Sequence, residues 1–269
     1  MPDQKNGISV VIPYFKGEPY INYTLTQLYA SLHISGLRHE VILINDNPEE
    51  SVEHLRITYP YLIILNNTHN IGIANTRNRG REISIYPYIY FIDQDDGVDD
   101  AFFSVAKKYM EKENDMILYN FTKISTAKTG KFYNQFFRLY VKWISEKLLI
   151  TYGNVFKSPG QVVFRKEIAS KFIHTTAMGA DDFFLFIDLF ANRESKKMTY
   201  IHDVLFHYRV HDDNYSKKAD FKRSEMECFQ AYALIRPEIE KYRKVLTKRH
   251  SGDLYIRIIS KFIKKLITM

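Results

Sequence analysis

The sequence contains little cysteine and lacks any long hydrophobic run. Its single cysteine, Cys228, excludes an intrachain disulfide, so we expect a reducing compartment. The N-terminal residues MPDQKNGISVV lack the basic and then apolar pattern of a signal peptide. No stretch approaches the roughly 18 consecutive apolar residues that a membrane span requires. These absences predict a cytoplasmic protein, for which any contact with the cell membrane would be peripheral and on the inner face of that membrane.

Acidic residues are also scarce at the C-terminal end. Residues 241–269 hold nine Lys or Arg and one acid, Asp253, which gives this segment a net charge of +8. Because the whole chain carries +7, residues 1–240 carry −1. A basic tail suits an anionic lipid surface or nucleic acid, and it gives no indication of the substrate of the near-neutral remainder.

What the sequence does contain is a regular alternation of strands and helices. Four apolar runs in the first hundred residues predict strands, namely GISVVIP, EVILIND, YLIILNN and YIYFID. Helical spacing predicts helices over residues 18–37 and 70–83. Such alternation predicts an α/β fold, a mostly parallel sheet with helices on both faces. Beyond residue 100 we expect helices over 102–113 and 181–190, strands at MILYNF and YIHDVLFHYRVH, and a strand that runs into a helix at GQVVFRKEI. Residues 131–157 are aromatic and basic and are left unassigned, and the remainder of the chain is predicted to be helical and charged.

Polar residues gather at the ends of the predicted strands, where open α/β sheets bind ligands. The stretch YIYFIDQDDGVDD places five aspartates within eight positions after one such strand. Like charges this close raise one another's pKa unless a cation lies among them, so the stretch is either a solvated acidic turn or a cation site. An EF-hand loop is excluded, because the fifth position counted from Asp93 is Gly97. Asp-x-Asp-Asp instead suits Mg²⁺ or Mn²⁺ bound to a diphosphate.

A series of motifs, taken together, resembles the family 2 glycosyltransferases of GT-A fold, which use nucleotide sugars. The motifs are ISVVIPYFKGE, VILINDN, NIGIANTRNRG, FIDQDD, GADDFF and YRVHDDNYS. The resemblance covers about residues 7–216. It implies a Rossmann-like GT-A domain over residues 1–216, with a nucleotide-binding half (1–100) and an acceptor-binding half (101–216). A basic helical extension over 217–269 follows.

The resemblance also implies how the donor is bound. Asp46 matches a carboxylate that accepts a hydrogen bond from the uracil N–H, and Arg77 matches an arginine that helps to hold the base. Phe15 occupies the position of an aromatic residue that packs on the base, and Pro13 belongs to the same donor-binding segment. Asn45, and Phe15 with Lys16, depart from the family pattern, which puts the nucleobase in question, with uridine as the default.

The metal site and the catalytic base follow from the same resemblance. Asp93 and Asp95 match the D-x-D pair that binds Mn²⁺ or Mg²⁺ and the diphosphate, with Asp96 beside them. Asp182 matches the general base, and His211 matches a histidine near the diphosphate and the metal. Breaking the anomeric C–O bond places negative charge on the nucleoside diphosphate, which a divalent metal neutralises. One base and one displacement predict inversion at the anomeric carbon.

The implied activity is metal-dependent, inverting transfer from a UDP-sugar to a hydroxyl of a glycan or lipid-linked acceptor, as in bacterial capsule or envelope polysaccharide synthesis.

Several residues also have interpretations that do not involve catalysis. Asp182 could be a first-turn acid favoured by the helix dipole, His211 a structural histidine, and Arg77 the partner of a helix-face acid. The chain as a whole could be a lapsed GT-A enzyme that serves as a binding or scaffold subunit. A sugar nucleotidyltransferase would need a glycine-rich basic loop, and VVIPYFKGE offers one glycine and one lysine.

The C-terminal residues 254–269 have an amphipathic pattern. Their apolar residues fall on one helical face, namely Tyr255, Ile258, Ile259, Phe262, Ile263 and Leu266. Their basic residues fall on the other face, namely Arg257, Lys261, Lys264 and Lys265. Such a helix can lie in a membrane interface, or it can pack on the domain with its basic face in solvent. We expect no nucleic-acid partner, because aromatic stacking groups are sparse there.

Overall fold

The structure is a computed structural model that describes residues 6–125, 129–130, 141, 143–177, 179–191, 193–211 and 220–268. The chain divides into two compact units. Unit 1 comprises Met1–Lys131, Ser158–Ala169 and Lys196–Val210, and unit 2 comprises Phe132–Lys157, Ser170–Ser195 and His211–Met269. Each unit is therefore assembled from separate stretches of chain. The boundary expected between residues 216 and 217 stays a prediction.

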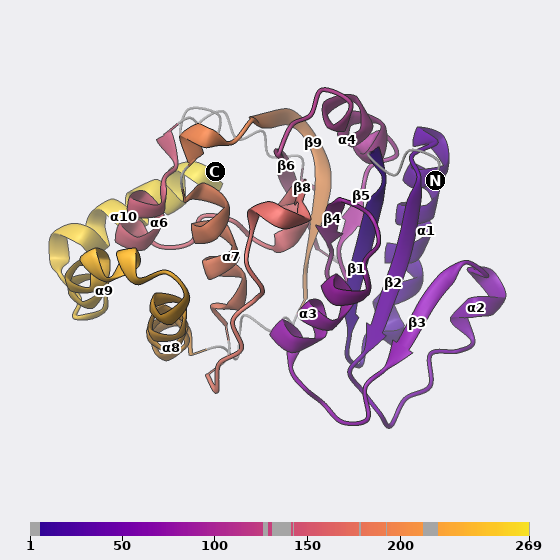
Figure 1. The fold of residues 1–269 in the computed structure, drawn as a ribbon, viewed down its shortest axis with the longest axis horizontal. Helices are drawn as coiled ribbons and strands as arrows, with labels where there is room; N and C mark the ends of the chain where they lie inside the picture. The colour runs from indigo at the N-terminus through magenta and orange to yellow at the C-terminus, as the bar shows by residue number, and fades with distance from the viewer. Residues whose placement is uncertain are drawn as a thin grey trace. The chain divides into compact units, whose positions relative to one another are not determined.

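Unit 1 is built on one sheet with the strand order β3-β2-β1-β4-β8-β6-β9-β5, and β7 pairs with β6 (Figure 1). The strands are β1 (Ile8–Tyr14), β2 (His39–Asn45), β3 (Leu62–Asn66), β4 (Tyr88–Phe91), β5 (Gly97–Val98), β6 (Met116–Ser125), β7 (Thr129–Gly130), β8 (Val162–Arg165) and β9 (Met198–Val210). The first four strands are mutually parallel, as predicted. Next to them, β8 runs antiparallel to both β4 and β6, whereas β9 is parallel to β6.

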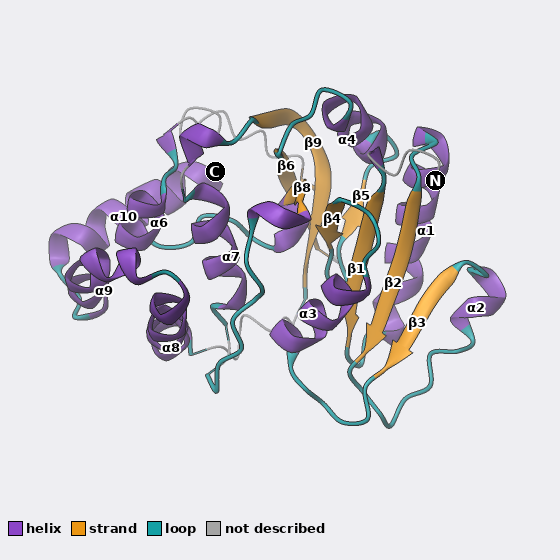
Figure 2. Ribbon diagram, in the orientation of Figure 1, coloured by secondary structure: helices purple, strands orange, loops and turns teal. Residues whose placement is uncertain are grey.

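Helices cover both faces of this sheet, which confirms the predicted α/β fold (Figure 2). Those of unit 1 are α1 (Glu18–Ser35), α2 (Leu55–Thr58), α3 (Ile73–Ile83) and α4 (Phe102–Met110). Every residue of β1 is buried, because alternate side chains face opposite layers. Val10 belongs to the core that α1 and α4 complete, whereas Val11 faces α3. A Cβ on Gly80 of α3 would lie 2.3 Å from Val11 Cγ1, so only glycine lets this helix approach the sheet.

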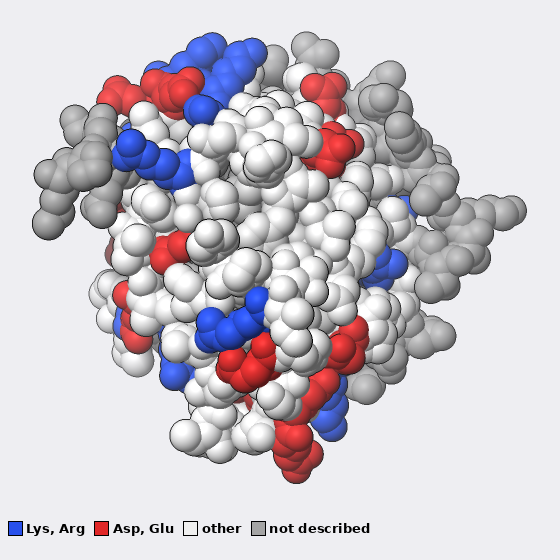
Figure 3. Space-filling view, turned by 90° about the vertical axis from the view of Figure 1, so that its right-hand side faces the viewer, with Lys and Arg blue, Asp and Glu red and all other residues white. Residues whose placement is uncertain are grey.

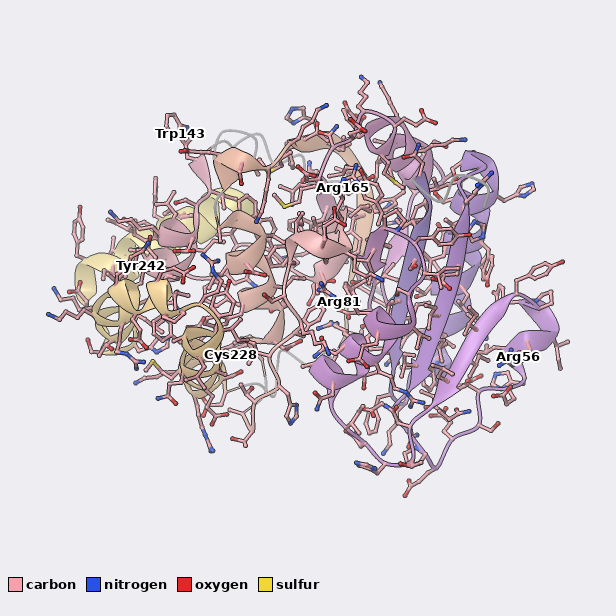
Figure 4. All side chains as sticks on the ribbon, viewed as in Figure 1. Arg56, Arg81, Trp143, Arg165, Cys228 and Tyr242 are labelled. Atoms are coloured by element: carbon pink, nitrogen blue, oxygen red, sulfur yellow. The ribbon has the colours of Figure 1, made fainter. Side chains whose placement is uncertain are left out.

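The strand ends differ in places from the expected ones. YIYFID ends as a strand at Phe91, and Gly97–Val98 forms the short strand β5 that pairs with β9. After β8 the expected helix is only a 3₁₀ turn, Lys166–Ile168. Arg81, near the end of α3, donates to the carbonyl oxygens of Lys166 (2.5 Å) and Ala169, which ties this turn to the helix (Figure 4).

The regular secondary structure of unit 2 is helical over its described residues. Its helices are α6 (Glu146–Tyr152), α7 (Asp181–Phe190), α8 (Phe221–Ile235), α9 (Arg243–His250) and α10 (Leu254–Thr268), with 3₁₀ turns at Arg193–Ser195 and Pro237–Tyr242. The expected helix over 181–190 and the helical remainder are confirmed. In the stretch 131–157, which the sequence left unassigned, residues 131–140 and 142 lie outside the described residues, and α6 lies in the part that is described. Among the described residues, none of the helices is both long and apolar enough to cross a bilayer.

Candidate active site

The carboxyl ends of β1, β2 and β3 meet at one edge of the sheet, as the sequence predicted. Tyr14 is in register with Asn45, and Asn45 with Asn66. Pro13 is buried within β1, opposite Ile44 of β2. Because the strands are parallel and in register, the loops that follow them leave the sheet together. This edge of unit 1 is the candidate donor site.

Asp46, the first residue after β2, is buried and organises the loop that leads into α3. Its carboxylate accepts hydrogen bonds from Asn67 Nδ2 at 2.7 Å, Ile71 N at 2.8 Å and Gly72 N at 3.0 Å. Gly72 has φ 83°, a left-handed conformation that favours glycine. Asp46 Oδ2 accepts one of these bonds, and a carboxylate oxygen can accept two. Asp46 thus has an architectural role, and its contact with a nucleobase stays a prediction.

Arg77 on α3 joins the acidic turn to this site. It is 3% exposed, and its Nη2 lies 2.6 Å from Asp93 Oδ1. Arg77 therefore pairs with one of the predicted metal-binding carboxylates. Charge-assisted hydrogen bonds of this kind are short and strong, so Arg77 holds Asp93 in place and offsets part of the charge of the turn.

Asp96 points into the protein. Its side chain is fully buried, and its Oδ1 accepts a hydrogen bond from the backbone N–H of Arg209 at 2.9 Å. Burial raises the pKa of Asp96 well above its ordinary value, and the charges of Asp95 and Asp93 raise it further. The neutral acid is thus favoured at Asp96. Its expected part in metal binding stays a prediction, and Asp93 and Asp95 remain the more accessible pair.

Arg209 and Gln94, which were not among the predicted site residues, fix the acidic turn. Arg209 of β9 donates from Nε to the carbonyl oxygen of Asp95 at 2.8 Å, and its guanidinium lies 4.4 Å from the ring centroid of Tyr23 on α1. Gln94 bonds both backbone groups of Phe15, accepting from N at 2.8 Å and donating to O at 2.9 Å. These partners are far apart in sequence, so only the fold reveals the contacts. Arg209 does lie in the motif YRVHDDNYS, which pointed to this segment.

The loop after β1 is shaped by its contact with Gln94. Lys16 has φ 54°, a left-handed conformation that is costly for a side chain other than glycine. A Cβ on Gly17 would lie 2.3 Å from the Gln94 Cδ, so a larger residue there would displace the Gln94 side chain. Phe15 is 42% exposed, and the Lys16 ammonium lies 5.4 Å from its ring centroid. An exposed aromatic ring beside a cation is thus presented at the end of β1.

The donor set of the turn is compatible with a divalent cation. Among the described residues, no group of three or more His, Cys, Asp or Glu side chains is arranged to hold a metal ion. Mg²⁺ and Mn²⁺ do not need such a group, because they take one or two carboxylates and complete their shell with water and phosphate oxygens. Asp93 and Asp95 can supply those carboxylates, because both side chains are more accessible than that of the buried Asp96.

The two remaining predicted residues belong to unit 2. Asp182 is half-buried in the first turn of α7, after the fully buried Ala180 at the N-cap. A first-turn acid is favoured by the helix dipole whatever its function, so its role as general base stays a prediction. His211 is half-buried and directly follows β9. Phe15, Asp46, Arg77, Asp93 and Asp95 are thus gathered at the strand ends of unit 1, whereas Asp182 and His211 are part of unit 2.

Known proteins share both the sequence pattern and the fold. YibD, an uncharacterized glycosyltransferase of Escherichia coli (strain K12), is 32% identical over 106 residues, which are 36% of this chain and 28% of YibD. EpsH of Bacillus subtilis (strain 168) is 23% identical over 264 residues, covering 89% of this chain and 72% of EpsH. The match thus spans under a third of YibD. This similarity therefore does not assign the activity of the whole YibD protein to this chain.

Solved structures agree on the fold. S. aureus TarS 1-349 in complex with UDP-GlcNAc superposes with a TM-score of 0.61 at 16% identity, covering 85% of this chain and 66% of that one. The mannosyltransferase PcManGT from Pyrobaculum calidifontis, in complex with GDP-Man and Mn²⁺, gives a TM-score of 0.58 at 15% identity and covers 99% of this chain and 75% of that one. These likenesses show the GT-A fold.

The family model described as glycosyl transferase family 2 matches residues 9–173. This range contains the candidate donor site, from Pro13 to Asp96, and ends before Asp182 and His211. It spans more than half of the 269-residue chain. The chain therefore belongs to glycosyl transferase family 2.

Proposed function

We propose that the protein transfers a sugar from a UDP-sugar to a hydroxyl of a glycan or lipid-linked acceptor, with inversion and with Mn²⁺ or Mg²⁺. The observation that carries the proposal is the carboxylate turn at the end of β4. Arg77 Nη2 lies 2.6 Å from Asp93 Oδ1, and Arg209 Nε donates to the carbonyl oxygen of Asp95. A turn fixed on both sides is preorganised for a ligand, which lowers the cost of binding.

In this proposal Asp93 and Asp95 hold the divalent cation. When bound, the cation neutralises the negative charge that develops on the leaving nucleoside diphosphate. Arg77 keeps the Asp93 carboxylate in place and adds positive charge nearby. Phe15 packs on the base, and Asp46 Oδ2 accepts the imino N–H, for which it has a lone pair left. Hydrogen bonds from Asn67 and Ile71 keep the Asp46 carboxylate oriented.

The Asp182 carboxylate acts as general base. It takes the proton of the acceptor hydroxyl while the hydroxyl oxygen forms a bond to the anomeric carbon. The bond from that carbon to the diphosphate oxygen breaks, and its electron pair leaves with the diphosphate. Attack from the side opposite the leaving group inverts the anomeric configuration, with no covalent enzyme intermediate. His211 contributes a contact to the diphosphate and the metal.

Calorimetric titration tests the donor site first. We expect UDP to bind in Mn²⁺ and to lose most of its affinity after EDTA is added, and we then expect turnover of a UDP-sugar. Binding of GDP in place of UDP would correct the nucleobase. Metal-dependent binding without turnover of any nucleotide sugar would favour the lapsed scaffold instead. No nucleoside diphosphate binding under either condition would contradict the proposal.

We also propose that α10 brings the enzyme to an anionic membrane surface, which suits a lipid-linked acceptor of capsule or envelope polysaccharide synthesis. Three apolar side chains of α10 are exposed, Tyr255 by 73%, Ile258 by 57% and Phe262 by 62%. Lys261 is exposed on the same helix, and residues 241–269 carry a net charge of +8. An apolar stripe within a basic segment is complementary to anionic lipid.

A further inference from the structure

The loop that leads into α7 is held by a single carboxylate of α8. Glu227 accepts hydrogen bonds from the Thr176 N–H at 2.8 Å, the Thr176 hydroxyl at 2.9 Å and the Ala177 N–H at 3.0 Å. Arg223, one turn earlier on α8, donates from Nε to the same carboxylate at 2.8 Å. Two consecutive peptide N–H groups of the loop are therefore fixed by one side chain, which orients the loop backbone as well as tethering it.

The same face of α8 also fixes the residue that begins α7. Ala180, the N-cap of α7, provides no side-chain cap, and its N–H donates to Ser224 Oγ at 3.0 Å. Its carbonyl oxygen lies 3.8 Å from Cys228 Sγ, and both Ser224 and Cys228 are fully buried. Glu227 and Cys228 follow Ser224 by three and four residues, so all three side chains lie on one side of α8. The start of α7 is thus determined by α8.

Asp182 is the second residue of α7, two positions after the anchored Ala180. Gly179 has φ 126°, which favours glycine, and the chain then passes through Ala180 into the first turn of α7. Burial, together with the charges of the Asp181 and Asp182 carboxylates, raises the pKa of the Cys228 thiol to about 12. The thiol therefore stays protonated and adds no further negative charge beside Asp181 and Asp182.

We propose that Glu227 is a positioning residue for sugar transfer. By holding Thr176 and Ala177, it fixes the N-terminus of α7 and so the place of the Asp182 carboxylate. This inference rests on the proposed function, because it takes Asp182 as the general base. It gives α8 a part in catalysis, although α8 lies beyond both the expected transferase domain (1–216) and the matched range 9–173.

Steady-state kinetics of Glu227→Ala and Glu227→Gln test the proposal. We expect Glu227→Ala to lower kcat by about tenfold or more, because small displacements of a catalytic group cost rate, while KM for the donor and Kd for UDP stay unchanged. Glu227→Gln keeps one acceptor oxygen and should recover part of kcat. The matched control is Glu240→Gln, which removes a charge of unit 2 that pairs with Arg243 at 2.6 Å, and it should leave kcat unchanged.

Two results would overturn the proposal. One is an unchanged kcat in Glu227→Ala. The other is a fall of kcat in both Glu227 variants in proportion to the fraction that has unfolded, as measured by thermal unfolding. Hydrogen exchange separates this proposal from the proposed function. If the wild-type protein turned over no nucleotide sugar, the proposed function would fail, whereas the anchoring would still be tested by the exchange of the N–H groups of Thr176 and Ala177. Their protection should fall in Glu227→Ala, and unchanged protection would refute the anchoring itself.

Discussion

At the residue scale, the carboxylates of the acidic turn have distinct environments although they lie within four positions. Asp93 pairs with Arg77, Asp96 is buried and favours its neutral form, and Asp95 has its carbonyl bound by Arg209. We therefore expect Asp95→Ala to weaken Mn²⁺-dependent UDP binding by about tenfold or more, because a small hard cation depends on each carboxylate it has. Calorimetry measures this loss. Asp100→Ala, an exposed acid of the same stretch, is the control and should bind UDP as the wild type does.

The general base is tested by separating binding from turnover. Asp182→Asn keeps the size of the side chain and removes its basicity, so UDP binding should persist while kcat falls by about 10² to 10⁴. Isothermal titration and a donor-consumption assay measure the two quantities. Glu194→Gln, an exposed acid near the other end of α7, should change neither. Near-full activity of Asp182→Asn would assign the base to another residue.

Glu227 also predicts a pH dependence. Hydrogen bonds from Ala177 and Thr176, with Arg223 nearby, lower the pKa of Glu227 from 4.5 to about 2. A lowered pKa in the folded state means that these bonds stabilise the protein fully above about pH 4.5 and that the contribution is lost as the pH falls from 4.5 towards 2. Thermal unfolding of the wild type and of Glu227→Gln should therefore differ above pH 5 and converge at lower pH. A difference in thermal stability that stayed constant across this pH range would show that the charge of Glu227 does not stabilise the protein.

At the scale of elements, β3 is an edge strand of the sheet and is protected by a neighbouring arginine. Arg56 of α2 donates to the carbonyl oxygens of Leu62 at 3.1 Å and Ile64 at 3.4 Å, while its Nε binds Glu53 at 2.7 Å (Figure 4). Open strand edges promote pairing with other chains. We expect Arg56→Ala to increase self-association, measured by light scattering. Arg56→Lys keeps the charge but lacks the planar fork that reaches two carbonyls, so it should behave like Arg56→Ala. If neither variant self-associated more than the wild-type protein, this role of Arg56 would be refuted.

Local patterns predicted the elements far better than their pairing. The run ISVVIP and the helical spacing of α1 and α7 are properties of adjacent residues, so β1, α1 and α7 could be predicted. The two-residue strand β5 has no pattern of its own, since its pairing with β9 defines it. Likewise, Gln94 reaches Phe15 and Glu227 reaches Thr176 only because the fold brings distant segments together. The candidate site was therefore predictable where a motif marked it, at Asp46, Arg77 and Asp93, and its supporting contacts were not.

At the scale of the whole molecule, charge is unevenly distributed. On the side of the molecule where α1 and β3 lie, charges of both signs are interspersed around a broad area without charged side chains (Figure 3). This agrees with the net charge of −1 for residues 1–240 against +8 for residues 241–269. Attraction to an anionic surface should therefore depend on the C-terminal segment, and it should weaken with salt.

Vesicle binding tests the membrane proposal. In a variant with Tyr255, Ile258 and Phe262 each replaced by Ser, we expect sedimentation with anionic vesicles to fall by about tenfold or more, because the buried apolar area of the interface is lost. The matched control replaces Ile57 and Tyr61, which are 87% and 86% exposed but lie in unit 1, outside the basic segment. If exposure alone governed binding, both variants would lose it equally. Loss confined to the α10 variant, together with release by high salt, would locate the membrane contact in the basic helix.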